Sequence, residues 1–166
     1  MTVGNKIKHI RKLQGDYFKN KPHYNCGGFA LGTYDWYLPY ECRGEDWLAY
    51  FKEFDEGYLT EEEAILGLTN TCVDFMLNDI NGIRIIEDES EIKKNEYAIA
   101  FRIGFADDDF HYARRSDEGV WYHKMGSAAI RECDFNIYDR IWDCGAYVYE
   151  GPVVLFAIRK DVSNEF

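Results

Sequence analysis

Residues 109–126 read DFHYARRSDEGVWYHKMG, and this stretch predicts a β-hairpin. Phe110 to Arg115 and Val120 to Lys124 are short runs rich in aromatic and β-branched side chains, which favour strands. The connection between them contains Asp and ends in Gly, as is common in hairpins. His111 and His123 fall near the middle of the two runs. Because paired strands bring opposite residues about 5 Å apart, the hairpin can hold both imidazoles on one face.

The rest of the second half of the chain also has the two-residue period of strands. Residues 83–86 and 96–105 predict two more strands, and residues 152–158 predict a final, well buried one. Residues 127–146 show no clear period. They are expected to form a long loop across the sheet.

The first half of the chain predicts helices instead. One helix is expected from Asn25, a good N-cap residue type, to Leu31. Residues 45–54 predict a second helix, and Thr60-Glu61-Glu62-Glu63 is a capping-box pattern that opens a third one, which runs to Asp79. This segregation predicts an α+β fold, with N-terminal helices packed on a C-terminal antiparallel β-sheet.

Composition limits the classes of partner. The 166 residues fit a single domain. The net charge of −11 argues against nucleic acid and anionic membranes, which attract basic proteins. No run of about 18 apolar residues predicts a membrane span. The five cysteines form no CxxC pair and no leader is recognisable, which favours a cytoplasmic location, while signal-less export and release by lysis stay open.

Cys26 is the candidate nucleophile. It falls in the first turn of the helix expected from Asn25, where unpaired backbone N–H groups favour negative charge. Since a helix N-terminus and a nearby histidine both lower a thiol pKa, we expect a reactive thiolate. The same N–H groups can hold an oxyanion, helped by Tyr24 or Asn25. Gly27 lets a substrate backbone approach closely.

The two hairpin histidines are the candidate proton carriers. His111 is expected to act as the base, with His123 fixing its tautomer. Trp121, Tyr122 and Trp36 are candidates for the walls of a groove.

The hairpin segment resembles the histidine hairpin of uncharacterised bacterial and phage-borne relatives in the NlpC/P60 branch of the papain-like superfamily, which carry patterns such as DFHxYRxxxDGxWxHKxG. Asn25-Cys26 followed by small and apolar residues is similar to their cysteine motif. The resemblance implies a papain-like fold and a Cys26-His111-His123 triad that attacks an amide or ester carbonyl. It also implies an extension over residues 1–24 and a helical insertion over residues 45–79. Asn25-Cys26-Gly27-Gly28 stands where peptidoglycan hydrolases have Asp-Cys-Ser-Gly.

Other interpretations of these residues stay open. The fold can serve as a catalytically silent binding module for a protein partner. Cys26, His111 and His123 could together ligate zinc, although local ligand pairs are missing, and no cofactor or metal is expected. Cys72, Cys133 and Cys144 are interpreted as small buried hydrophobes, and Cys42 as a loop thiol. A peptide or another acyl compound is the expected substrate.

Overall fold

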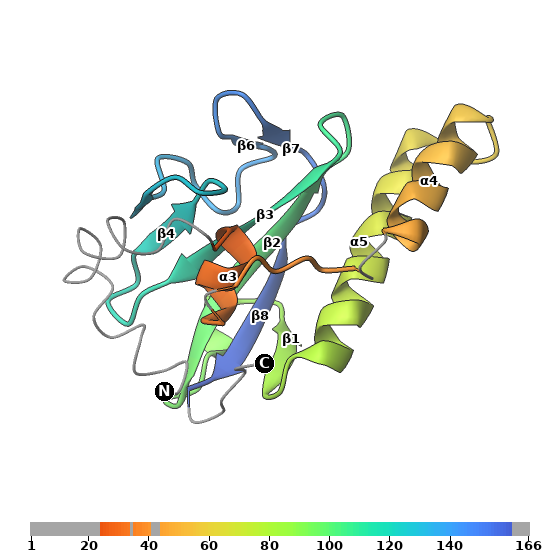
Figure 1. Ribbon diagram of the computed structural model, residues 1–166. Helices are drawn as coiled ribbons and strands as arrows, with labels where there is room; N and C mark the ends of the chain where they lie inside the picture. Colours follow the sequence, from red (N-terminus) through yellow and green to blue (C-terminus); the bar gives the residue numbers. More distant parts are fainter. Residues whose placement is uncertain (1–23, 34, 41–43, 161–166) are drawn as a thin grey trace.

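The computed structural model describes residues 24–33, 35–40 and 44–160. In this part of the chain, helices α3 (Cys26–Leu31), α4 (Glu45–Asp55) and α5 (Glu61–Asp79) precede eight strands (Figure 1). None of these helices combines the length and apolarity needed to cross a bilayer. The expected extension over residues 1–24, apart from Tyr24, lies outside the described residues, and so does Cys42.

Six strands form one antiparallel sheet in the order β1-β8-β2-β3-β4-β5. They are β1 (Ile83–Ile86), β2 (Glu96–Gly104), β3 (Asp109–Arg115), β4 (Trp121–Lys124), β5 (Ile130–Glu132) and β8 (Val154–Arg159). Strands β6 (Trp142–Asp143) and β7 (Val148–Tyr149) form a separate pair, and a 3-10 turn, η1 (Glu89–Glu91), joins β1 to β2. The predicted α+β class is confirmed. The expectation of a loop over residues 127–146 is wrong in part, because β5 and β6 lie there.

Local signals set the helix starts as predicted. The Thr60 hydroxyl accepts a hydrogen bond from the Glu63 N–H at 3.2 Å, and the Glu63 carboxylate accepts one from the Thr60 N–H at 3.0 Å. This capping box opens α5. Leu68, Cys72 and Met76 of α5 are fully buried in the core that the helices form with the sheet.

The two faces of the sheet carry different cores. Along β2, residues Ile99 and Phe101 pack with the helices, whereas Ala98 and Ala100 face the opposite side. The small alanines leave space for aromatic side chains from β6 and β7, which pair near one end of β3 (Figure 1). The same alternation in β3 places neighbouring side chains on different faces of the sheet. It therefore decides which β3 side chains can contribute to the candidate site.

Candidate functional site

The hairpin of β3 and β4 brings two histidines together. Ala113 pairs with His123 in the ladder, so His111 lies two residues further along the same face of β3. The His111 Nε2 and His123 Nδ1 atoms are 2.9 Å apart, at hydrogen-bond distance. Both side chains are buried. The predicted meeting of the two imidazoles is confirmed, and it leaves Nδ1 of His111 as the nitrogen that His123 does not occupy.

Aromatic rings surround this histidine pair. Tyr149 of β7 stacks on His111, with ring centroids 5.0 Å apart, and Phe135 meets His123 edge-on at 5.1 Å. The Tyr149 hydroxyl donates a hydrogen bond to the Asp109 carboxylate at 2.7 Å. The rings pack against both imidazoles and contribute to their burial.

Burial keeps both imidazoles neutral. It lowers the pKa of His111 well below the ordinary value of 6.5, and the neighbouring His123 lowers it further. Burial also lowers the pKa of His123 to about 4, with a further lowering from Arg131 that Asp134 partly offsets. At neutral pH, His111 is therefore in the form that can accept a proton.

We expect the fold to lose stability in acid because of this pair. A histidine whose pKa is lower in the folded chain is protonated first in the unfolded chain. The free energy of unfolding therefore has its full value above pH 6.5 and decreases as the pH falls from 6.5 toward 4. The decrease is about 3 kcal/mol for His123 alone. Urea unfolding across this range measures the loss. His123→Asn should flatten the dependence, and an unchanged slope in that variant would contradict the assignment.

Asn25 fixes the start of α3. Its side-chain oxygen accepts hydrogen bonds from the N–H groups of Gly28 at 3.0 Å and Tyr37 at 2.9 Å, and its amide donates to the Tyr37 carbonyl at 2.7 Å. The predicted N-cap is confirmed. Asn25 also borders the cavity beside Cys26. These bonds engage its side-chain oxygen and one of its two amide N–H groups and position the cysteine, and its role at an oxyanion stays a prediction.

Asn25→Ala should therefore cost more than the loss of an ordinary cap. We expect a decrease of about 2 to 3 kcal/mol in the free energy of unfolding, because buried groups of Tyr37 lose partners along with the helix end. Thr60→Ala, at the exposed cap of α5, is the matched control and should cost about 1 kcal/mol. Equal losses in chemical denaturation would refute this role for Asn25.

The Cys26 thiol is buried in the first turn of α3. Only 5% of the residue is exposed, and burial raises the pKa of its thiol to about 12. Backbone N–H groups of Tyr112 and Gly27 donate to the sulfur and lower the pKa, but by less than burial raises it. The expectation of a lowered pKa is thus wrong, because desolvation outweighs the helix terminus.

Cys26 and His111 line the same cavity, which has a volume of about 470 Å³. They reach it from opposite faces of β3. Cys26 belongs to the core on the helix side, whereas His111 stacks on Tyr149 of the other core. The cavity lies where the β3–β4 ladder ends, beyond the Ala113–His123 pair. In the described segments, no hydrogen bond joins the Cys26 sulfur to either imidazole.

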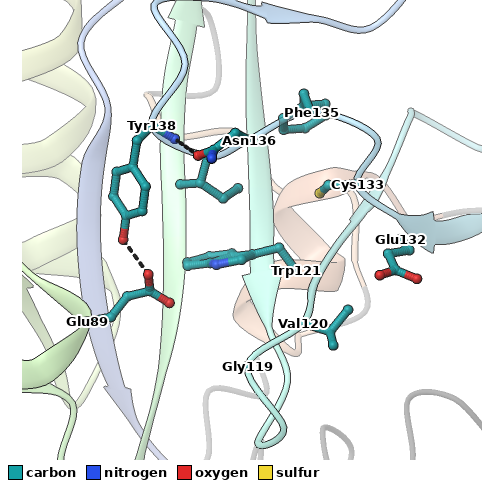
Figure 2. A pocket seen from close by; sticks show the side chains of 10 residues that line it. Glu89, Gly119, Val120, Trp121, Glu132, Cys133, Phe135, Asn136 and Tyr138 are labelled. Atoms are coloured by element: carbon teal, nitrogen blue, oxygen red, sulfur yellow. Dashed lines mark hydrogen bonds between the residues drawn. The ribbon is translucent and has the colours of Figure 1, made fainter.

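The other predicted site residues take different positions. Tyr24 is fully buried in a small core with Phe29 and is not among the residues that line this cavity. Trp121 lines a separate cavity with Cys133 and Tyr138 (Figure 2). The substrate-binding role expected for Trp121 stays a prediction, because Trp121 pairs with Arg115, four positions along β3 from His111, and is not among the residues that line the cavity beside Cys26.

Other aromatic residues form part of the wall of the shared cavity. Trp36 is 55% exposed and lines this cavity, in agreement with its prediction as a wall residue. The wall also includes Leu38, Tyr40, Phe110, Tyr147 and Tyr149. Gly27 has a structural function, since a Cβ there would come within 3.2 Å of the Tyr37 backbone and side chain. Its lack of a side chain lets α3 approach that segment closely.

Lys124 belongs to the site although the sequence did not single it out. Its buried Nζ donates hydrogen bonds of 2.5 Å to the carbonyls of Tyr24 and Gly126. It thereby fastens the chain before Cys26 to the end of β4, and its charge lowers the pKa of the Cys26 thiol. The one sequence feature that could have indicated Lys124 is its position directly after His123.

Cys144 is the other residue that sequence reasoning missed. It lies at the turn between β6 and β7, and its sulfur is within 4.8 Å of ligand atoms of both histidines. Burial raises the pKa of its thiol to about 12. No local motif marks it, because only the pairing of β6 with β7 carries it to the imidazoles.

Comparison with protein-family models, curated proteins and solved structures finds no match.

Proposed function

We propose that this chain is a thiol hydrolase or acyl transferase of the papain-like, NlpC/P60-like type. The single observation that carries the proposal is the shared cavity, which Cys26 and His111 both line while His123 holds the far nitrogen of His111. Two further features support it. A helix with a cysteine in its first turn contacts the histidine hairpin, and cysteine, base and orienting residue follow in the order of that superfamily.

The resting site holds a neutral thiol and a neutral imidazole at one cavity, because burial raises the Cys26 pKa and lowers the His111 pKa. Attack therefore has to be coupled to proton transfer. The Cys26 sulfur bonds to the substrate carbonyl carbon while its proton passes to Nδ1 of His111. His123 keeps that imidazole oriented through Nε2. The Cys26 backbone N–H is the donor proposed for the oxyanion.

In the following steps, His111 first donates the proton that it took from Cys26. His111 gives the proton to the leaving amine or alcohol, which departs and leaves Cys26 as a thioester. Water, or another acceptor with an amine or hydroxyl, then attacks the thioester as His111 takes up its proton. The cysteine thiol is restored when the product acid or acylated acceptor leaves.

The cavity wall indicates the class of acyl group. Trp36, Leu38, Tyr40 and Phe110 are aromatic or apolar. This part of the wall favours an apolar acyl chain or peptide side chain, while Asp109 and Ser127 supply polar groups that can fix its orientation. We propose a peptide or similar acyl compound with an apolar group next to the scissile carbonyl.

A burst experiment tests this proposal. The full chain is mixed with p-nitrophenyl esters, thioesters and peptide anilides that carry small or aromatic acyl groups. We expect rapid release of one leaving group per protein molecule, followed by slower steady turnover, because the thioester accumulates. Absence of both burst and turnover across the panel, in protein with native circular dichroism, would refute the proposal.

A catalytically silent binding module is the second candidate. The observation that favours it is the buried, protonated Cys26, whose thiol interacts with backbone N–H groups of β3 and α3. In that case the aromatic cavity would hold a side chain of a protein partner without chemistry. The burst experiment separates the two candidates.

A further inference from the structure

We infer that His111, His123 and Cys144 form a binding site for a divalent ion of the zinc class. The three residues each offer one ligand atom, and these atoms lie within 4.8 Å of one another. They come from β3, β4 and the β6–β7 turn, so the fold assembles the set from three separate segments. The inference extends beyond the hydrolase proposal, because it uses a thiol for which that mechanism has no role.

The dimensions suit zinc with small movements. Zn–N bonds of 2.0–2.1 Å at a tetrahedral angle place two ligand nitrogens about 3.3 Å apart. The facing nitrogens of His111 and His123 are 2.9 Å apart. A sulfur bonded to the same ion would lie about 3.6 Å from each nitrogen. Cys144 therefore has to approach by at most about 1 Å, and it lies in a turn between two-residue strands, where Gly145 has a positive φ of 86°.

The chemistry of the donors selects the ion. Two imidazoles and one thiolate favour zinc and other late transition metals over calcium and magnesium, which prefer oxygen. Phe135, Trp142 and Tyr149 surround the histidines with rings. Such an apolar shell strengthens the metal–ligand bonds and restricts access to solvent. Three protein ligands leave a fourth position for water or another ligand.

Binding changes the protons of the site in a defined way. In the free pair, one imidazole donates its N–H across the 2.9 Å contact. When both facing nitrogens bind the ion, the donating imidazole moves its proton to its other nitrogen, where the second imidazole already carries its own. The Cys144 thiol loses its proton to solvent, so one proton is released for each ion bound.

This tautomer would switch off the proposed chemistry, a consequence that rests on the hydrolase proposal. With Nε2 bound to the ion, Nδ1 of His111 carries a proton and cannot accept the one from Cys26. The ion would act as a reversible inhibitor that binds both the proposed base and the orienting histidine and leaves the nucleophile unoccupied. Removal of the ion would restore the free base.

Cobalt(II) tests the binding site without reference to activity. The full chain, stripped of metal with a chelator, is titrated with cobalt(II), and zinc then displaces it. We expect one ion per chain, a thiolate-to-cobalt charge-transfer band and tetrahedral visible bands. Cys144→Ser should abolish the charge-transfer band and weaken binding by about 100-fold or more, and Cys26→Ser should preserve both. His123→Asn, a second ligand variant, should weaken binding similarly.

Two results would overturn the inference: an unchanged band in Cys144→Ser, or loss of the band in Cys26→Ser with native circular dichroism. Zinc sensitivity is then measured as the ratio of turnover with and without zinc in each protein. A low ratio for the natural chain and a ratio near one for Cys144→Ser are expected. Cobalt binding in a chain without any turnover would retain the metal site and refute only the hydrolase proposal.

Discussion

Cys26→Ser is expected to lower turnover by at least about 1,000-fold while the protein keeps its fold. A serine hydroxyl at this position is a far weaker nucleophile, and the neutral His111 has to remove a much less acidic proton. The substitution is small, and the backbone N–H groups of Tyr112 and Gly27 that donate to the sulfur can donate to the serine oxygen, so folding should be preserved. Steady-state rates on the best substrate of the ester and anilide panel, normalised to native protein by circular dichroism, measure the effect.

The other thiols supply the controls for this prediction. Cys133→Ser should leave turnover within a few-fold of the natural chain, because Cys133 lines a different cavity (Figure 2). Cys144 lies near the same imidazoles as the proposed base. A 1,000-fold loss in Cys144→Ser together with full activity in Cys26→Ser would identify Cys144 as the nucleophile and refute the assignment.

His111→Ala is expected to have the second large effect, a loss of about 1,000-fold in kcat. The imidazole is the group proposed to take the thiol proton, and the Cys26 pKa of about 12 leaves almost no thiolate at neutral pH without it. His123→Asn should cost less, about 100-fold or below, because it disturbs the orientation of His111 rather than removing the base.

The pH dependence distinguishes these two roles. Without His111, the remaining activity should rise with pH up to the Cys26 pKa of about 12, since only the ionised thiolate can react. His123→Asn should shift the acidic limb of the profile and keep the plateau above it. Equal losses and identical profiles for the two variants would contradict the division into base and positioning residue.

Much of the fold was predictable because its signals are local. The Thr60 capping box, the Asn25 cap and the alternation through residues 109–124 each act within a few residues, and each predicted the element that is present. Strands β5, β6 and β7 have two or three residues, too few to show a period. They exist because distant segments pair with them, which no window of sequence reveals.

The candidate site was predictable in part for the same reason. A hairpin with histidines twelve positions apart places both imidazoles on one face, and the structure has them 2.9 Å apart. The charge state of Cys26 was not predictable, because it depends on how closely β3 and α3 enclose the sulfur. Cys144 reaches the histidines only through the β6–β7 pair, and Trp121 belongs to a cavity formed with residues near positions 89 and 138.

Peptide-mapped mass spectrometry of the trapped acyl protein tests the central claim most directly. The full chain reacts with an activated ester whose thioester hydrolyses slowly, and the reaction is stopped in acid and digested. We expect one acyl group per chain, located on Cys26, and its loss in His111→Ala. An acyl group on Cys144, Cys133 or Cys42, or equal labelling of Cys26 with and without His111, would contradict the proposed pairing of this thiol with this imidazole.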